Sequence, residues 1–161
     1  MSDEKIISVG VGDIQVAKAP IIITTYLGSC VAVCLYAPLH KVGGVIHFML
    51  PKAGPTHEGL ILKKEKYADT GIPELLRQLK NVFKLEKDAF VAKIFGGANV
   101  VKSVSRQFGQ ENVEAAGEII KRLRMNILAS HTGGEKGYKI MFDLNTGKVN
   151  CTVFGGPPIE Y

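Results

Sequence analysis

The sequence lacks a hydrophobic run long enough to cross a membrane. Its most apolar region, residues 21–50, is interrupted by threonine, glycine, serine, proline, histidine and lysine. No window there reaches the roughly 18 uninterrupted apolar residues that a spanning helix needs. The opening MSDEKIISVG begins with acidic residues and lacks the charged-then-apolar order of a secretory signal. We therefore expect a soluble, cytoplasmic protein with no direct membrane insertion.

Cysteine is scarce, since Cys30, Cys34 and Cys151 are the only three and form no CxxC pair. An odd number leaves at least one thiol free, which favours a reducing compartment over a disulfide scaffold. The four histidines also lack the HxxxH spacing of metal ligands, so we expect no metal site and no cofactor. The glycine pairs at 96–97 and 133–134 match no Walker or dinucleotide pattern and are more typical of tight turns.

Dense charge of one sign is absent as well. The net charge is +5, and the lysines are scattered, whereas a nucleic-acid-binding surface shows a denser basic patch with aromatic neighbours. We expect no nucleic-acid partner, and attraction to an acidic protein surface fits the charge equally well. Lys121, Arg122 and Arg124 suit such a surface but are more typical of a solvated helix face.

The chain does have the length and apolar content needed for a core. Its 161 residues are 46% hydrophobic and include 18 glycines, which is typical of one turn-rich globular domain over residues 1–161. Runs of β-branched and aromatic residues predict strands, and two segments with apolar residues at helical spacing predict helices. The expected fold class is α/β of the α+β type, with a mixed, mostly antiparallel β core and two main amphipathic helices packed outside.

The predicted elements follow one another without a linker or a repeat. The first helix covers ADTGIPELLRQLKNVF, residues 68–83. The second opens at Asn112, after a polar helical stretch near Val100–Phe108 that Gly109 interrupts. Strands are expected at Ile6–Val11, Ile21–Leu27, Val31–Tyr36, Val45–Leu50, Ala89–Phe95, Ile127–Ala129, Tyr138–Leu144 and Lys148–Phe154.

The stretch TTYLGSC places Cys30 directly after a Leu-Gly-Ser turn. A glycine lets the backbone approach a substrate closely and leaves main-chain N–H groups free to face it. The N–H groups of Cys30 and of the Gly28–Ser29 turn are therefore candidates for an oxyanion hole. This approach is typical of a nucleophilic cysteine.

A hairpin aligns Cys30 with a histidine. If a four-residue loop at Ala37–His40 joins the flanking strands, directly opposed residues sum to 77 and Cys30 faces His47. Opposed side chains have Cβ atoms about 4.5–5.5 Å apart, close enough for an imidazole to reach a thiol. An adjacent imidazole lets the thiol ionise and can then protonate a departing group.

A third group usually orients the imidazole of such a pair. Thr24, six residues before Cys30, is a candidate, as are Thr25 and Ser29. A structural interpretation stays open beside this one: a cysteine in an apolar strand is more often a core residue, and His47 is equally consistent with a hydrogen-bonded core histidine. Cys34 and Cys151 are interpreted as structural.

Several longer stretches of this sequence resemble the CheD family, the chemoreceptor glutamine deamidases of prokaryotic chemotaxis. The Cys and His blocks, at their mutual separation, are the specific part of the resemblance. The matching stretches are Thr24, LGSCVAVCLY (27–36), GGVIHFMLP (43–51), KYADTGIPELL (66–76), KIFGGANV (93–100), FGQEN (108–112) and the TGG…TG pattern of residues 132–147.

The resemblance implies a protein-glutamine glutaminase, with Cys30 as nucleophile, His47 as general base and acid, and Thr24 positioning the histidine. Its substrates would be glutamine side chains on the cytoplasmic helices of methyl-accepting receptors, which become glutamates through a thioester. Some members are also credited with receptor methylesterase activity, and members associate with a CheC-type phosphatase. The implied fold resembles that of toxin-type cysteine deamidases.

Two residues depart from the family pattern, and two other functions stay open. His131 stands where an acidic residue is usual, and Tyr138 where an arginine is common; neither belongs to the implied triad. One alternative is a non-catalytic adaptor that binds receptors or a CheC-type partner through the same surface. The other is a different thiol hydrolase, such as a protease or a peptidoglycan amidase.

Overall fold

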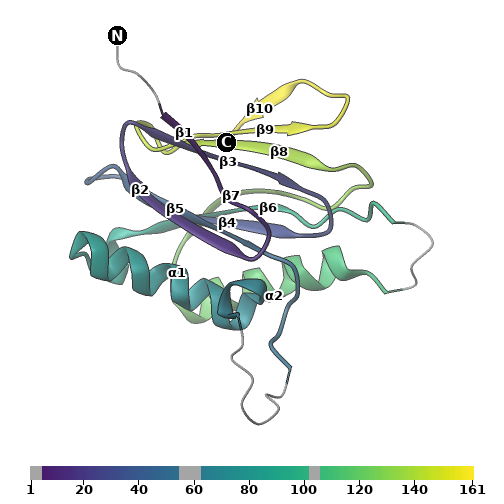
Figure 1. Cartoon of the computed structure of the whole chain (residues 1–161), viewed down its shortest axis with the longest axis horizontal. Helices are drawn as coiled ribbons and strands as arrows, with labels where there is room; N and C mark the ends of the chain where they lie inside the picture. The colour runs from purple at the N-terminus through teal and green to yellow at the C-terminus, as the bar shows by residue number, and fades with distance from the viewer. Residues whose placement is uncertain (1–4, 55–62, 102–105) are drawn as a thin grey trace.

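Two five-stranded sheets are stacked on each other, and two α-helices cover the free face of one of them (Figure 1). The structure is a computed structural model that describes residues 5–54, 63–101 and 106–161. In these ranges the elements are β1 (Lys5–Ser8), β2 (Asp13–Lys18), β3 (Ile21–Leu27), β4 (Val31–Ala37), β5 (Val42–Phe48), η1 (Lys64–Lys66), α1 (Ala68–Phe83), η2 (Lys87–Ala89), β6 (Val91–Gly96), α2 (Phe108–Arg122), β7 (Ile127–Thr132), β8 (Tyr138–Asp143), β9 (Val149–Val153) and β10 (Pro158–Glu160).

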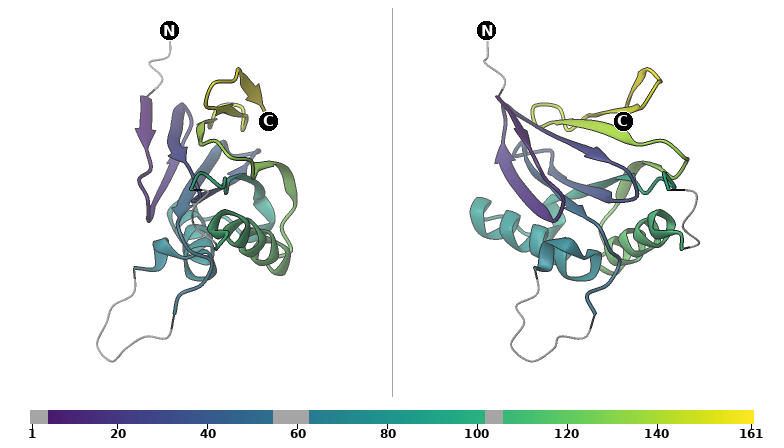
Figure 2. Two further views of the ribbon diagram at one scale, coloured as in Figure 1. Left: turned by 90° about the vertical axis from the view of Figure 1, so that its right-hand side faces the viewer. Right: turned by 45° about the vertical axis from the view of Figure 1, so that its right-hand side comes forward.

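The strand orders are β1-β3-β8-β9-β10 in one sheet, called here the outer sheet, and β2-β5-β4-β6-β7 in the other, the central sheet. The pairs β1–β3 and β6–β7 are parallel, and the remaining pairs are antiparallel. The left-hand view of Figure 2 shows the outer sheet, the central sheet and the helices as successive layers. The predicted fold class, a mixed and mostly antiparallel β core with two helices outside, is confirmed.

The central sheet is covered on both faces. Every residue of β4 and β5 is buried, because the outer sheet covers one face and the helices cover the other. Val31, Val33 and Leu35 face the helices, whereas Ala32 and Cys34 face the outer sheet. Burial on both faces explains why VAVCLYA and VGGVIHF read as continuous apolar runs rather than alternating ones.

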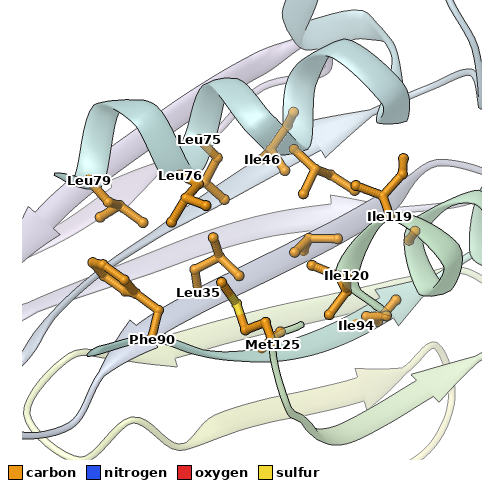
Figure 3. Packing of buried hydrophobic residues seen from close by; sticks show 14 of the residues in the cluster. Leu35, Ile46, Leu75, Leu76, Leu79, Phe90, Ile94, Ile119, Ile120 and Met125 are labelled. Carbon is orange, nitrogen blue, oxygen red and sulfur yellow. The ribbon is translucent and has the colours of Figure 1, made fainter. Parts of the chain in front are cut away.

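The helices are held by an apolar layer against the central sheet (Figure 3). Leu75, Leu76 and Leu79 of α1 point toward the strands, and Ile119 and Ile120 of α2 enter the same cluster. The predicted bounds of the first helix agree with α1. In the described part of the chain, neither helix has the length and apolar character needed to cross a bilayer.

The strand predicted at Ile6–Val11 corresponds to β1 alone, and β2 was not predicted. β1 ends at Ser8, and the chain then crosses from the outer to the central sheet, with Gly12 at φ +74°, before β2 begins at Asp13. The local pattern hides this crossing because apolar residues continue through it. The short β10 was not predicted either.

The prediction that the second helix opens at Asn112 is wrong, because α2 begins at Phe108 and continues through Gly109. Gly109 is a close-packing residue rather than an interruption. A Cβ there would collide with the carbonyl oxygen of Gly97, in the loop after β6. Of the helical stretch predicted near Val100–Phe108, residues 102–105 lie outside the described residues, and only Phe108 of the rest is helical.

Truncating a leucine beneath the central sheet should destabilise the protein strongly. Leu79 is 0% exposed and Val82, three residues later on α1, is 58% exposed. We expect Leu79→Ala to lower the free energy of unfolding by about 2–5 kcal/mol, since it removes buried methyl groups and leaves a cavity. Val82→Ala should change it by less than about 0.5 kcal/mol. Urea denaturation measures both, and equal losses would contradict the packing described.

Candidate active site

Cys30 lies in the turn between β3 and β4, and the loop after β6 holds that turn in place. The N–H of Gly97 donates to the carbonyl of Cys30 at 2.9 Å, and the N–H of Ala98 donates to that of Gly28 at 2.9 Å. The approach requires a glycine, because a Cβ at Gly96, where φ is +105°, would lie 2.5 Å from the Cys30 carbonyl oxygen. Cys30 is partly buried and packs against the cluster between the two sheets.

His47 is near the end of β5, and the observed register corrects the predicted one. Ala32, not Cys30, lies directly opposite His47. The connection occupies residues 38–41 instead of 37–40, with Lys41 in the left-handed region at φ +54°. The numbers of two directly opposed residues therefore sum to 79 rather than 77. A shift of two residues keeps the same face, so His47 and Cys30 both lie on the side of the central sheet that meets the outer sheet.

Hydrogen bonds to the outer sheet fix the tautomer of His47. The Thr25 hydroxyl donates its single proton to the Val9 carbonyl at 2.7 Å, and its oxygen lies 2.8 Å from His47 Nδ1. Nδ1 must therefore carry the proton and donate to the hydroxyl oxygen. Nε2 is left with its lone pair, and it is buried with no partner among the described residues. This is the protonation pattern of a general base.

Burial moves both titratable groups toward their uncharged forms. It lowers the pKa of His47 below its ordinary value, while the Val9 carbonyl and the Asp13 carboxylate oppose that change. It also raises the pKa of the Cys30 thiol. The two groups therefore rest as a neutral imidazole and a neutral thiol at neutral pH, and a thiolate needs proton transfer to an acceptor.

The turn also presents main-chain donors. No hydrogen bond within the described ranges uses the N–H of Ser29 or of Cys30, whereas the carbonyls of Gly28, Ser29 and Cys30 all accept one. The donors predicted for an oxyanion hole are therefore available for a ligand.

One pocket reaches this turn, and a second lies beyond it along α2. The first, about 100 Å³, is lined by Ser29, residues 98–101, Arg106, Phe108 and Gly109. The second, about 440 Å³, is the larger pocket; it shares Asn99 and Gly109 with the first and extends along α2 to Gly133 and Gly134. The described lining of neither pocket includes Cys30 or His47.

Comparison with known proteins relates this chain to a family. The family described as "CheD chemotactic sensory transduction" matches residues 49–153. A probable chemoreceptor glutamine deamidase CheD of Pyrococcus abyssi is 44% identical over 96% of this chain and 96% of its own. The chemoreceptor glutamine deamidase CheD of Thermotoga maritima is 39% identical over 92% of both chains. A probable CheD of Desulforamulus reducens is 38% identical, over 94% of this chain and 92% of its own.

This chain belongs to the CheD family. The resemblance assigns the histidine-positioning role to Thr24, and the structure places another hydroxyl beside His47. The Thr24 hydroxyl donates to the Ile140 carbonyl of β8 at 2.8 Å, while Thr25 contacts the imidazole. Strand alternation is the reason, because Ile23, Thr25 and Leu27 point into the core and Thr24 does not. That alternation is visible in the sequence and is the signal that distinguishes the two threonines.

The other two cysteines of this CheD-family chain are buried. Cys34 and Cys151 both lie in the cluster between the sheets. Burial raises the pKa of the Cys151 thiol to about 11 and that of Cys34 further still. They stay protonated and shielded, as expected of structural cysteines. The part of the chain that the structure describes holds no group of three or more acidic, histidine or cysteine side chains arranged for a metal.

The two departures from the family pattern lie beside the larger pocket. His131 Nδ1 is 2.5 Å from the hydroxyl of Tyr161, near the C-terminus. Tyr138 donates its hydroxyl proton to the carbonyl of Gly133, which lines that pocket. Tyr138 therefore fixes the loop after β7, whereas His131 holds Tyr161, and neither hydrogen bond involves Cys30.

Removing the Thr25 hydroxyl should slow the reaction of Cys30 with an alkylating agent. We expect Thr25→Val to lower the rate constant for iodoacetamide at neutral pH by at least about tenfold. A positioned base accelerates a reaction by roughly 10²–10⁴-fold, and this variant should lose part of that acceleration. The reason is that Nδ1 loses the acceptor that fixes its tautomer. Thr24→Val is the matched control and should stay within about threefold of wild type. The reverse order would assign the positioning role to Thr24.

Proposed function

We propose that this CheD-family protein hydrolyses glutamine side chains of chemoreceptors to glutamate, with Cys30 as nucleophile and His47 as base. The observation that carries the proposal is the hydrogen-bond chain from His47 Nδ1 through Thr25 to Val9, which leaves Nε2 free to accept a proton. The curated relatives are named as chemoreceptor glutamine deamidases, and the match to them runs nearly end to end.

The first half-reaction forms a thioester. His47 Nε2 takes the thiol proton of Cys30, and the thiolate attacks the carboxamide carbon of glutamine. The N–H groups of Ser29 and Cys30 donate to the oxygen that becomes negative. The imidazolium then gives its proton to the carboxamide nitrogen, the C–N bond breaks, and ammonia leaves. Because burial disfavours the charged imidazole, this second proton transfer is favoured once the nitrogen has become basic.

The second half-reaction restores the enzyme. His47 Nε2 accepts a proton from water, and the hydroxide that forms attacks the thioester carbon. The C–S bond breaks, the imidazolium returns the proton to the sulfur, and glutamate is released. Thr25 keeps Nδ1 protonated through both halves, so the same nitrogen exchanges protons each time.

Receptor cytoplasmic helices are the proposed substrate surface, which places the reaction in the cytoplasm. A net charge of +5 suits an acidic partner, and Cys30 is partly exposed, so a glutamine side chain has access to it. Receptor methyl esters would react by the same steps with methanol as the leaving group. That activity, and association with a CheC-type phosphatase, stay predictions, as does the non-catalytic adaptor alternative.

Peptide mass spectrometry of a receptor fragment tests the proposal directly. The purified protein is incubated with a chemoreceptor cytoplasmic fragment, and each glutamine is followed for the one-dalton gain of conversion to glutamate. Wild type should convert particular glutamines, whereas Cys30→Ala should give none while keeping its thermal stability, because the site is partly exposed. Conversion by Cys30→Ala would remove this thiol from the mechanism. Receptor binding without conversion by wild type would favour the adaptor.

The pH dependence of deamidation should report the low pKa of His47. The imidazole must be neutral to accept the thiol proton, and burial lowers its pKa, so the acid limb of kcat/KM should lie below the ordinary histidine value of about 6.5. Asp13→Asn should move that limb lower still, because the Asp13 carboxylate raises the pKa. Asp88→Asn on η2 is the control. An acid limb above 6.5, or one that Asp13→Asn raises, would contradict this assignment.

A further inference from the structure

We propose that Asn112 of α2 is a positioning residue that fixes the Cys30 turn against the end of the His47 strand; its catalytic part rests on the proposed function. Apart from tyrosine and cysteine, only three polar or charged side chains are buried in the described ranges, namely Thr25, His47 and Asn112. Thr25 and His47 contact each other, and Asn112 contacts the backbone on both sides of the same site. Asn112 is 0% exposed, and burying its amide is costly unless hydrogen bonds replace those lost to water.

The amide bridges two segments that are far apart in the chain. Asn112 Nδ2 donates to the carbonyl of Ser29 at 3.1 Å and to that of Met49 at 3.0 Å. Ser29 directly precedes Cys30, and Met49 is two residues after His47. Because both partners are acceptors, the nitrogen must be the atom that faces them, which fixes the orientation of the amide. Asn112 Oδ1 is left buried with no partner among the described residues.

This bridge sets the direction of a donor in the proposed oxyanion hole. The Ser29 carbonyl and the Cys30 N–H belong to one planar peptide group and point in opposite directions. Holding the carbonyl on Asn112 therefore aims the Cys30 N–H away from α2. A second contact docks the helix at the same place, because α2 meets the loop after β6 where Gly109 touches Gly97. Gly97 in turn donates to the Cys30 carbonyl.

Replacing the amide should loosen the turn and slow catalysis without weakening substrate binding. Asn112→Leu keeps a similar shape but cannot donate, and Asn112→Asp keeps the shape but presents oxygen to both carbonyls. We expect kcat for deamidation to fall at least about tenfold with KM within about threefold, since the donor acts on the developing oxyanion. We also expect backbone amide exchange at Gly97 and Ala98, whose N–H groups donate to the carbonyls of Cys30 and Gly28, to become at least about tenfold faster.

Ile120→Ala and Asn81→Ala are the controls. Ile120 is a fully buried α2 residue that shares no hydrogen bond with the turn, so Ile120→Ala should lower thermal stability without the selective change in exchange or kcat. Asn81, exposed on α1, should change nothing. If wild type fails to deamidate, the exchange measurement alone still decides whether the bridge exists. Unchanged exchange in both Asn112 variants, or an Ile120→Ala effect of the same pattern, would overturn the proposal.

Discussion

The burial of both faces of the β4–β5 hairpin is the constraint on which the rest of the structure depends. The hairpin lies at the centre of the molecule, with the outer sheet over one face and both helices over the other. Backbone groups there are satisfied by neighbouring strands, and side chains must be apolar unless they find partners. His47 is the one polar side chain of β5, and in an apolar layer its imidazole depends on the hydrogen bond to Thr25.

Buried polarity is concentrated at one end of this hairpin. His47 and Thr25 join the central sheet to the outer sheet, and Asn112 joins the helical layer to the turn before β4. All three layers therefore meet around Cys30. A buried polar group without a partner costs about 1–3 kcal/mol, and among the described residues two such atoms, His47 Nε2 and Asn112 Oδ1, are found here. Unsatisfied groups of this kind are typical of sites organised for chemistry rather than for stability alone.

The same arrangement explains why the reactive pair rests uncharged. A thiolate–imidazolium pair would place two charges in a site that excludes much of the water, and burial opposes both. In the mechanism that we propose, proton transfer is instead coupled to the arrival of an acyl carbon and to donors that stabilise its oxygen. Cys34 and Cys151 are protected by burial alone.

The sequence by itself determined the class of fold, the bounds of α1 and the approximate positions of eight of the ten described strands, because these follow from local periodicity and turn chemistry. It also indicated the face shared by Cys30 and His47 and the candidate nucleophile. Tertiary structure decided the rest. The crossing of residues 9–12 between sheets places the Val9 carbonyl beside Thr25, and no local pattern marks it. Gly109 is interpreted as a helix breaker from the sequence, whereas in the structure it lies within α2 and packs against Gly97. Asn112 is interpreted as a helix start from the sequence, whereas in the structure its amide donates to two carbonyls from distant segments. These contacts join residues 12 to 83 positions apart, so their energies depend on packing between layers that a linear pattern does not contain.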